Sequence, residues 1–276
     1  MEKKKILTIL SELCLLICTV VCWLPVYYFV ISAFKLRKDI VKYPLHIIWE
    51  RFTVDNFSYV WKNMKLAQSL FNTSFITIVT LMFLIGVSSM AGFALSRIKG
   101  KFFRVYYRAN VALMVVPFIS CLLSLVILST KLNLYNTVWG CIFIHTAWHL
   151  PFCAFLYAGF MGSLPVELEE AAYIDGCSTF QVYFQIFLPL LAPITATCCI
   201  RSGITIWNDF LLSSTLLNSA RKPTLMVGIN SFFGEYVSEY GYAFAGIILA
   251  SLPISILFIF LRKYFIKGLT AGAVKG

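Results

Sequence analysis

Residues 109–130 read ANVALMVVPFISCLLSLVILST, a run without one charged side chain. Three further runs share this character, at residues 132–166, 176–200 and 240–261. Roughly 18–20 apolar residues are enough for an α-helix to cross about 30 Å of hydrocarbon. A helix also satisfies its backbone polar groups internally, which lipid requires. These runs therefore predict an all-α integral membrane protein.

The composition of the whole chain supports this prediction. Of the 276 residues, 60% are hydrophobic and 13% are charged, whereas a soluble domain carries about 25% charged residues. The net charge of +11 does not indicate a nucleic-acid partner, because Lys and Arg form short clusters beside the apolar runs, where such residues anchor and orient a membrane protein. The apolar run Ile6–Phe34 is too long for a signal peptide, so we expect an uncleaved first span.

We expect six transmembrane helices, at roughly residues 10–33, 70–95, 109–130, 138–162, 186–213 and 240–262. Residues 1–65 would form the first helix and an ordered outer loop, residues 66–265 the five-helix transmembrane core, and residues 266–276 a cytoplasmic tail. A slight excess of Lys and Arg on the N-terminal side places both termini in the cytoplasm. Small residues would allow close helix approach at Gly86, Gly92, Ala158, Gly159 and Gly162.

An acidic loop separates the fourth and fifth predicted spans. Residues 164–176 read LPVELEEAAYIDG, with acidic side chains and no Lys or Arg. Pro165 suits the first turn of a helix, and the carboxylates that follow would lie near the positive helix N-terminus. Gly176 can adopt the left-handed conformation that ends a helix. Ser178 and Gln181 have capping-box spacing, so the pattern predicts a helix, a sharp turn and a second helix.

These residues also carry a family resemblance. The acidic loop resembles the EAA loop of binding-protein-dependent ABC importer permeases. The matching positions, to which the resemblance assigns ATPase coupling, are Glu170, Ala171, Ala172, Asp175, Gly176, Leu188 and Pro189. Other segments are similar to the carbohydrate, maltose-permease-like branch, namely Ala91–Arg97, Trp207–Phe210 and Gly268–Gly276. The resemblance implies a cytoplasmic EAA coupling helix that docks on a separate ATPase.

The resemblance implies a membrane-spanning permease subunit of an ATP-driven importer in a bacterial plasma membrane. It would translocate a sugar that an extracytoplasmic solute-binding protein delivers. Its expected partners are a second permease subunit, forming a heterodimer, a cytoplasmic ABC ATPase dimer that holds ATP and Mg, and membrane lipid. The chain contains no G-x-x-x-x-G-K-[ST] sequence, so we expect neither an enzyme nor a cofactor in this chain.

Polar residues within the spans are candidates for the translocation path, because charged groups in a membrane are costly and usually functional. The candidates are Arg201, Asn208, Asp209 and His149, with a packing role open for each. Arg201 and Asp209 could line one cavity but are too far around the helix to pair. His145 lies four residues before His149, but no third ligand is evident, so we expect no metal site. The nine cysteines lack CxxC spacing and are expected to pack as small residues.

The sequence leaves three alternatives to a sugar permease: another cargo, another kind of transporter, and an enzyme. The cargo of an ABC permease could be a polyol or a glycerol phosphate. A secondary transporter driven by an ion gradient would show inverted repeats and paired intramembrane carboxylates, and we find neither. A membrane-embedded enzyme would need a nucleophile or a metal-binding set, and none stands out.

Overall fold

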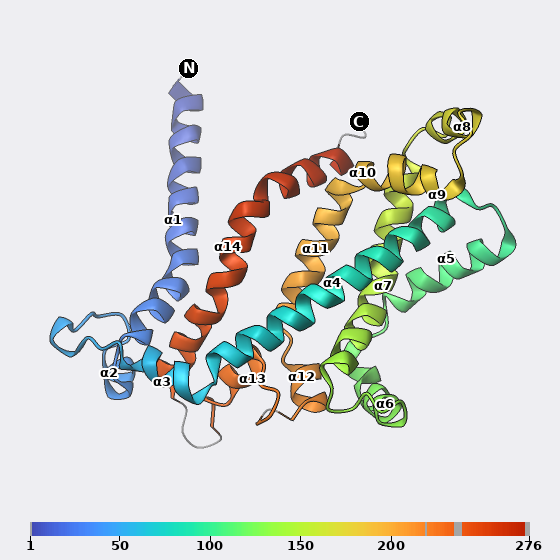
Figure 1. Cartoon of the computed structure of the whole chain (residues 1–276). Coiled ribbons are helices and arrows are strands. Elements are labelled where there is room, and N and C mark those ends of the chain that lie inside the picture. Colours follow the sequence, from blue (N-terminus) through green and yellow to red (C-terminus); the bar gives the residue numbers. More distant parts are fainter. Residues whose placement is uncertain (1, 219, 235–238, 274–276) are drawn as a thin grey trace. The chain divides into compact units, whose positions relative to one another are not determined.

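The computed structural model describes residues 2–218, 220–234 and 239–273, and this part consists of helices and connecting loops without a β-strand (Figure 1). The all-α prediction is therefore confirmed. The helices are α1 (Glu2–Ala33), α2 (Arg37–Lys42), η1 (Trp49–Arg51), α3 (Asp55–Asn63), α4 (Leu66–Arg97), α5 (Lys101–Leu113), α6 (Phe118–Lys131), α7 (Val138–Gly162), α8 (Glu167–Ile174), α9 (Thr179–Gln181), η2 (Val182–Phe187), α10 (Leu188–Leu190), α11 (Ala192–Trp207), α12 (Leu211–Leu216), α13 (Leu225–Asn230) and α14 (Tyr240–Ala273). Residues 266–273 of the predicted tail continue α14, and residues 274–276 lie outside the described residues.

The chain forms two compact units. Unit 1 comprises residues 1–67 and 228–252, and unit 2 comprises residues 68–227 and 253–276. In unit 1 the expected ordered outer loop contains α2, η1 and α3. The buried amide of Asn56 ties α3 to the end of α1, donating to the carbonyl oxygens of Ala33 at 2.7 Å and Lys35 at 2.9 Å. Burial lowers the pKa of the Lys35 amine, and the Asp39 carboxylate opposes this shift.

Within the described residues, three helices are long and apolar enough to cross a membrane by themselves, at Thr8–Ala33, Leu66–Arg97 and Val138–Gly162. Two bent pairs, α5 with α6 and α9–α10 with α11, reach the same length together. The described apolar part of α14, Tyr240–Ile256, is shorter. Every predicted span thus corresponds to helical structure, while the total of six spans stays a prediction.

The third predicted span, at residues 109–130, is not one continuous helix. α5 ends at Leu113, α6 begins at Phe118, and the two axes differ by 108°. Pro117 precedes α6 with extended backbone angles. Proline disfavours a helical conformation at the residue before it, here Val116, so an apolar run long enough to span is broken near its middle.

The fifth predicted span is also bent. α11 begins at Ala192, at 69° to the segment α9–α10, and it ends at Trp207 rather than at residue 213. The turns before Pro189 form the π-helix η2. In an α-helix the ring of Pro189 would clash with the carbonyl four residues earlier, and the wider π turn relieves this crowding. Pro193 lies in the first turn of α11, where its missing N–H costs no hydrogen bond.

The core of unit 2 forms around α7, which contacts α5, α6, α11 and α12. Cys141, Cys153 and Cys198 are fully buried in this core, which confirms a packing role for these three. All nine cysteines are free thiols. Of the small residues expected at helix contacts, Gly92 and Ala158 meet between α4 and α7. Gly86, Gly159 and Gly162 have open space beside them, so their expected contacts do not form among the residues that the structure describes.

Candidate functional site

The acidic loop forms the predicted helix, turn and second helix at one end of unit 2 (Figure 1). α8 begins at Glu167, because the carbonyl of Val166 accepts the amides of Glu169 at 2.9 Å and Glu170 at 3.1 Å. Pro165 therefore precedes the helix and does not lie in its first turn as expected. The three acids at the start of α8 face its positive end, which stabilises both the charges and the helix.

The turn after α8 depends on Gly176. Its φ of +83° lies in the left-handed region, where residues with a Cβ are disfavoured. The Cys177 amide then donates back to the Ala172 carbonyl at 2.9 Å, in the manner of a helix C-cap. The expected capping box is present: the Ser178 side chain accepts from the Gln181 amide, and the Gln181 side chain accepts from the Ser178 amide at 2.7 Å.

The surface of α8 is open to a partner. Glu170, Ala171, Asp175 and Gly176 are exposed, and Ala172 is the one buried residue of α8. Two large apolar side chains flank the turn and are also exposed, by 85% at Ile174 and 72% at Phe180. Of the other two residues assigned to coupling, Leu188 is half-buried and Pro189 is exposed.

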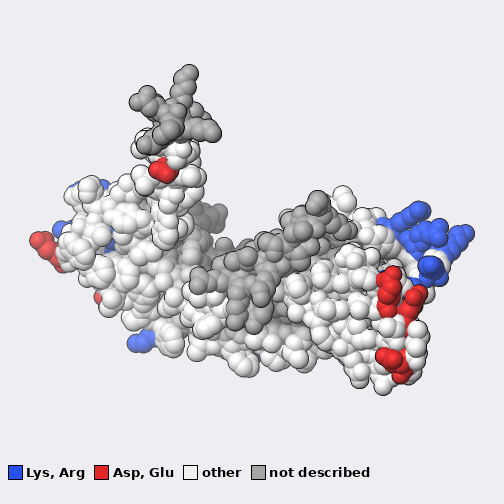
Figure 2. Space-filling model, turned by 90° about the horizontal axis from the view of Figure 1, so that it is seen from above, with Lys and Arg blue, Asp and Glu red and all other residues white. Residues whose placement is uncertain are grey.

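Charge of both signs gathers at this end of unit 2. Figure 2 shows acidic side chains beside a cluster of Lys and Arg. The exposed cations that follow α4 in the chain are Lys99, Lys101, Arg104 and Arg108. One cation behaves differently: Arg97, at the end of α4, forms an ion pair with Glu169, with 3.1 Å between Nε and Oε2. This ion pair therefore connects α8 to α4, in addition to the chain connections of α8 to α7 and toward α9.

A comparison with known families shows where this chain belongs. Residues 84–271, which include the acidic loop, match the family described as binding-protein-dependent transport system inner membrane component. The chain belongs to this transport family. A membrane component of a transport system passes solute and carries no catalytic centre, so the chain is a membrane-spanning protein and not an enzyme.

Curated members of the transport family resemble the chain over most of its length. The melibiose/raffinose/stachyose import permease protein MelC of Bacillus subtilis is 36% identical over 92% of both chains. The arabinooligosaccharides transport system permease protein AraQ of Halalkalibacterium halodurans is 33% identical over 91% of both. The probable starch degradation products permease AmyC of Thermoanaerobacterium thermosulfurigenes is 32% identical over 91% of both.

A solved structure supports the fold. The crystal structure of a bacterial ABC transporter involved in the import of alginate contains a chain that matches with a TM-score of 0.81. The match covers 96% of this chain and 98% of that chain at 20% identity. At this identity the likeness shows a shared fold and nothing further.

Two of the candidate path residues lie where α11 ends. Asp209 accepts hydrogen bonds from the Leu212 amide at 3.1 Å and from the amide and hydroxyl of Ser213 at 2.8 and 2.7 Å. It thereby caps the first turn of α12. Its Oδ2 lies 3.7 Å from Nε2 of the buried His145. Asn208 is exposed and donates to the Ile204 carbonyl at 2.9 Å.

The other two candidates, Arg201 and His149, line a cavity of about 150 Å³ between α5, α7 and α11. The Arg201 guanidinium lies 4.0 Å from the centre of the Phe152 ring, a distance at which a cation is attracted to an aromatic face. Asp209 lines a different, smaller cavity. The expectation that Arg201 and Asp209 could share one cavity was therefore wrong, because α11 ends between them. Among the residues that the structure describes, no group of three His, Cys, Asp or Glu could hold a metal ion.

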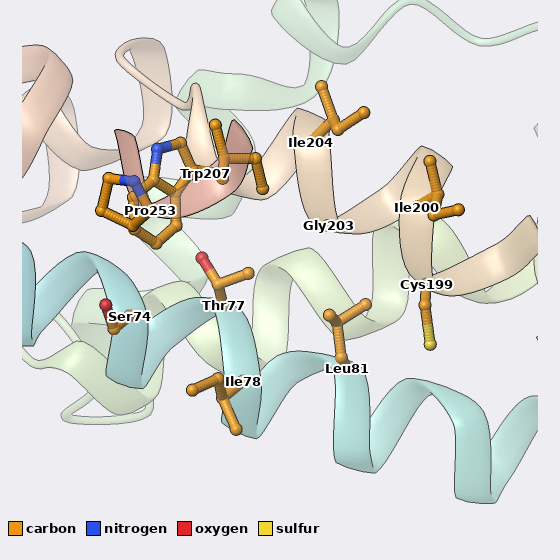
Figure 3. Close-up of a pocket in the computed structure, with 11 residues that line it drawn as sticks. Ser74, Thr77, Ile78, Leu81, Cys199, Ile200, Gly203, Ile204, Trp207 and Pro253 are labelled. Atoms are coloured by element: carbon orange, nitrogen blue, oxygen red, sulfur yellow. The ribbon is translucent and has the colours of Figure 1, made fainter. Parts of the chain in front are cut away.

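A larger cavity of about 320 Å³ lies between α4, α11 and the part of α14 that belongs to unit 2 (Figure 3). Its lining is mostly apolar and includes the buried indole of Trp207. The buried hydroxyl of Thr77 points toward this ring (Figure 3) and has no hydrogen-bond partner in the described structure. Neither side chain is charged, and neither was among the candidate path residues; the only signal in the sequence was that Trp207 begins the family-like segment Trp207–Phe210.

Proposed function

We propose that this chain is a permease subunit of an ATP-driven importer and that it passes a sugar from a solute-binding protein into a bacterial cell. The observation that carries the proposal is the α8–turn–α9 element, which has the EAA pattern and which the described residues of the chain leave largely exposed. Two relatives that match over nine-tenths of the chain, MelC and AraQ, are named for the transport of oligosaccharides, which supports a sugar as the cargo.

The surface of this element suits a docking site on a separate ATPase. Exposed carboxylates would steer α8 toward a basic cleft and set its register there. Ile174 and Phe180 would then bury apolar surface, as anchors at interface centres do. ATP and Mg would stay on that partner. We further propose six spans, with α8 and both termini on the cytoplasmic side, and a second permease subunit beside this one.

The same proposal includes a stretch of the sugar path. Ligand sites are usually concave and mostly apolar, with a few polar groups that fix orientation. The cavity beside Trp207 has this character, since an aromatic face can stack on a sugar ring and the Thr77 hydroxyl lacks a partner. Arg201 and His149, or Asn208 and Asp209, would lie on other stretches of the path, but their contacts also suit packing.

Glu170→Gln tests the proposed coupling. We expect ATP-dependent uptake of radiolabelled raffinose or maltose by the reconstituted importer to fall about tenfold or more, because interfacial charge pairs contribute roughly 1.5–7 kcal/mol. Membrane insertion should not change. Glu50→Gln, an exposed carboxylate on η1, is the control and should transport normally. Normal uptake by the Glu170 variant would refute the coupling role, and uptake that needs an ion gradient instead of ATP would favour a secondary transporter.

A further inference from the structure

One face of α4 contacts the segment 164–187, which contains α8, the turn, α9 and η2. Ser89, Phe93 and Arg97 follow one another at four-residue spacing, so they lie on one side of the helix. All three contact the segment 164–187. We refer to these three residues as the α4 stripe.

The first two members of the stripe hold the second half of the segment. The Ser89 hydroxyl lies 2.7 Å from the buried Tyr183 hydroxyl, within hydrogen-bonding distance. The Phe93 ring packs edge-on against the rings of Tyr183, at 5.5 Å between centroids, and Phe187, at 5.3 Å. Edge-to-face pairs at these distances stabilise a specific orientation beyond the area they bury, so η2 is fixed against α4.

Arg97 holds the first half of the segment. Besides its ion pair with Glu169, it donates from Nη2 to the Leu164 carbonyl at 3.2 Å. Its guanidinium also lies 5.0 Å from the centre of the Phe187 ring. The paired side chains are only 10% and 15% exposed, so water and salt screen this pair much less than they screen a surface ion pair.

α8 depends on such contacts for its position. It has eight residues and buries only Ala172, and helices shorter than about 12 residues are not stable by themselves in water. Its two chain connections, to α7 and toward α9, fix its ends but not its rotation. The Arg97–Glu169 pair is the one ion pair between α8 and another helix among the described residues.

We propose that Arg97 is a positioning residue that locks the docking helix α8 to α4, so that a displacement of α8 is passed directly to α4. This inference rests on the proposed function and adds α4 as a helix that the ATPase moves. Since α4 also packs closely on α7 at Gly92 and lines the cavity beside Trp207, the lock would connect the docking surface to the proposed path.

Hydrogen exchange of the purified chain tests the lock without any transport. Arg97→Ala and Glu169→Gln should both speed amide exchange in residues 164–176. Two matched variants should speed that exchange clearly less: Lys99→Ala removes an exposed cation near Arg97, and Glu167→Gln removes the same charge and the same favourable interaction with the α8 N-terminus without touching the pair. Equal exchange in all four variants would overturn the proposal.

The coupling ratio, sugar transported per ATP hydrolysed in proteoliposomes, tests the consequence. Arg97→Ala should lower this ratio about tenfold, within the range known for residues that carry coupling. Arg97→Lys should keep part of it, and the charge exchange Arg97→Glu with Glu169→Arg should restore more than either single change. If Glu170→Gln blocks uptake but the Arg97 and Glu169 variants keep the full ratio, only the lock is wrong. If Glu170→Gln transports normally, the proposed function itself fails.

Discussion

At the scale of single residues, the left-handed conformation of Gly176 determines the direction in which the chain leaves α8. A Cβ at this position would meet no atom within 4 Å, so the cost of a side chain comes from the backbone alone. Gly176→Ala should therefore destabilise the turn by about 1–2 kcal/mol and reduce ATP-dependent uptake.

The matched control for this change is Gly159→Ala. Gly159 is exposed in the last turn of α7 and also has open space around it, so alanine should not destabilise the helix and should stabilise it by up to about 0.5–1 kcal/mol. The stability of the two variants is compared by thermal unfolding in detergent, and their transport by uptake in cells. A Gly176 variant that behaves like the Gly159 variant would show that the turn tolerates another conformation.

Thr77 and Thr80 provide a test of the proposed path. Both are buried on α4 with hydroxyls that lack a partner in the described structure, but only Thr77 lines the cavity beside Trp207. Thr77→Val should raise the KM for sugar uptake about two- to tenfold, the effect of one lost hydrogen bond of about 0.5–1.5 kcal/mol. Thr80→Val should leave KM unchanged. Equal KM values for the two variants would remove this cavity from the path.

At the scale of elements, the contact between α4 and α7 depends on Gly92. A Cβ there would come within 2.4 Å of the Tyr157 Cβ and 3.0 Å of the Ala158 backbone. Gly92→Ala should thus separate the two helices and destabilise the protein by about 1–3 kcal/mol. Gly86 lies on the same helix, and a Cβ there would have nothing within 4 Å. Gly86→Ala should therefore leave the stability of the protein unchanged. The unfolding temperature in detergent distinguishes them, and equal values would mean that the helices can separate at no cost.

The bent elements show where sequence patterns stop being informative. An apolar run indicates that its residues prefer lipid. The same run fits one straight helix and two helices at 108°, so the pattern cannot distinguish them. Pro117 explains the first bend once it is seen, yet Pro151 lies inside the continuous helix α7. Whether a proline breaks a helix depends on whether neighbouring groups can satisfy the freed carbonyl, and those neighbours come from tertiary structure.

At the scale of the whole molecule, the proposed six spans predict the side of the membrane on which each loop lies. Lys62→Cys, in the outer loop, should react with a membrane-impermeant maleimide in intact cells. Lys101→Cys, after α4, should react only in inside-out vesicles, together with the native Cys177 beside α8. Mass spectrometry of the labelled peptides reports each site separately. Labelling of residues 62 and 101 from the same side would rule out the proposed topology.

Local sequence patterns are enough to predict a helical membrane protein and the helix–turn–helix of residues 167–181. These patterns are apolar runs of spanning length, acids before small residues, and a glycine followed by a capping box. Only the tertiary structure decided which residues face one another. It paired Arg97 with Glu169, placed Asp209 near His145, grouped residues 228–252 with the first 67, and placed Thr77 toward Trp207. The physical reason is that propensity, capping and lipid preference act within a few turns, whereas these contacts join positions far apart in the chain.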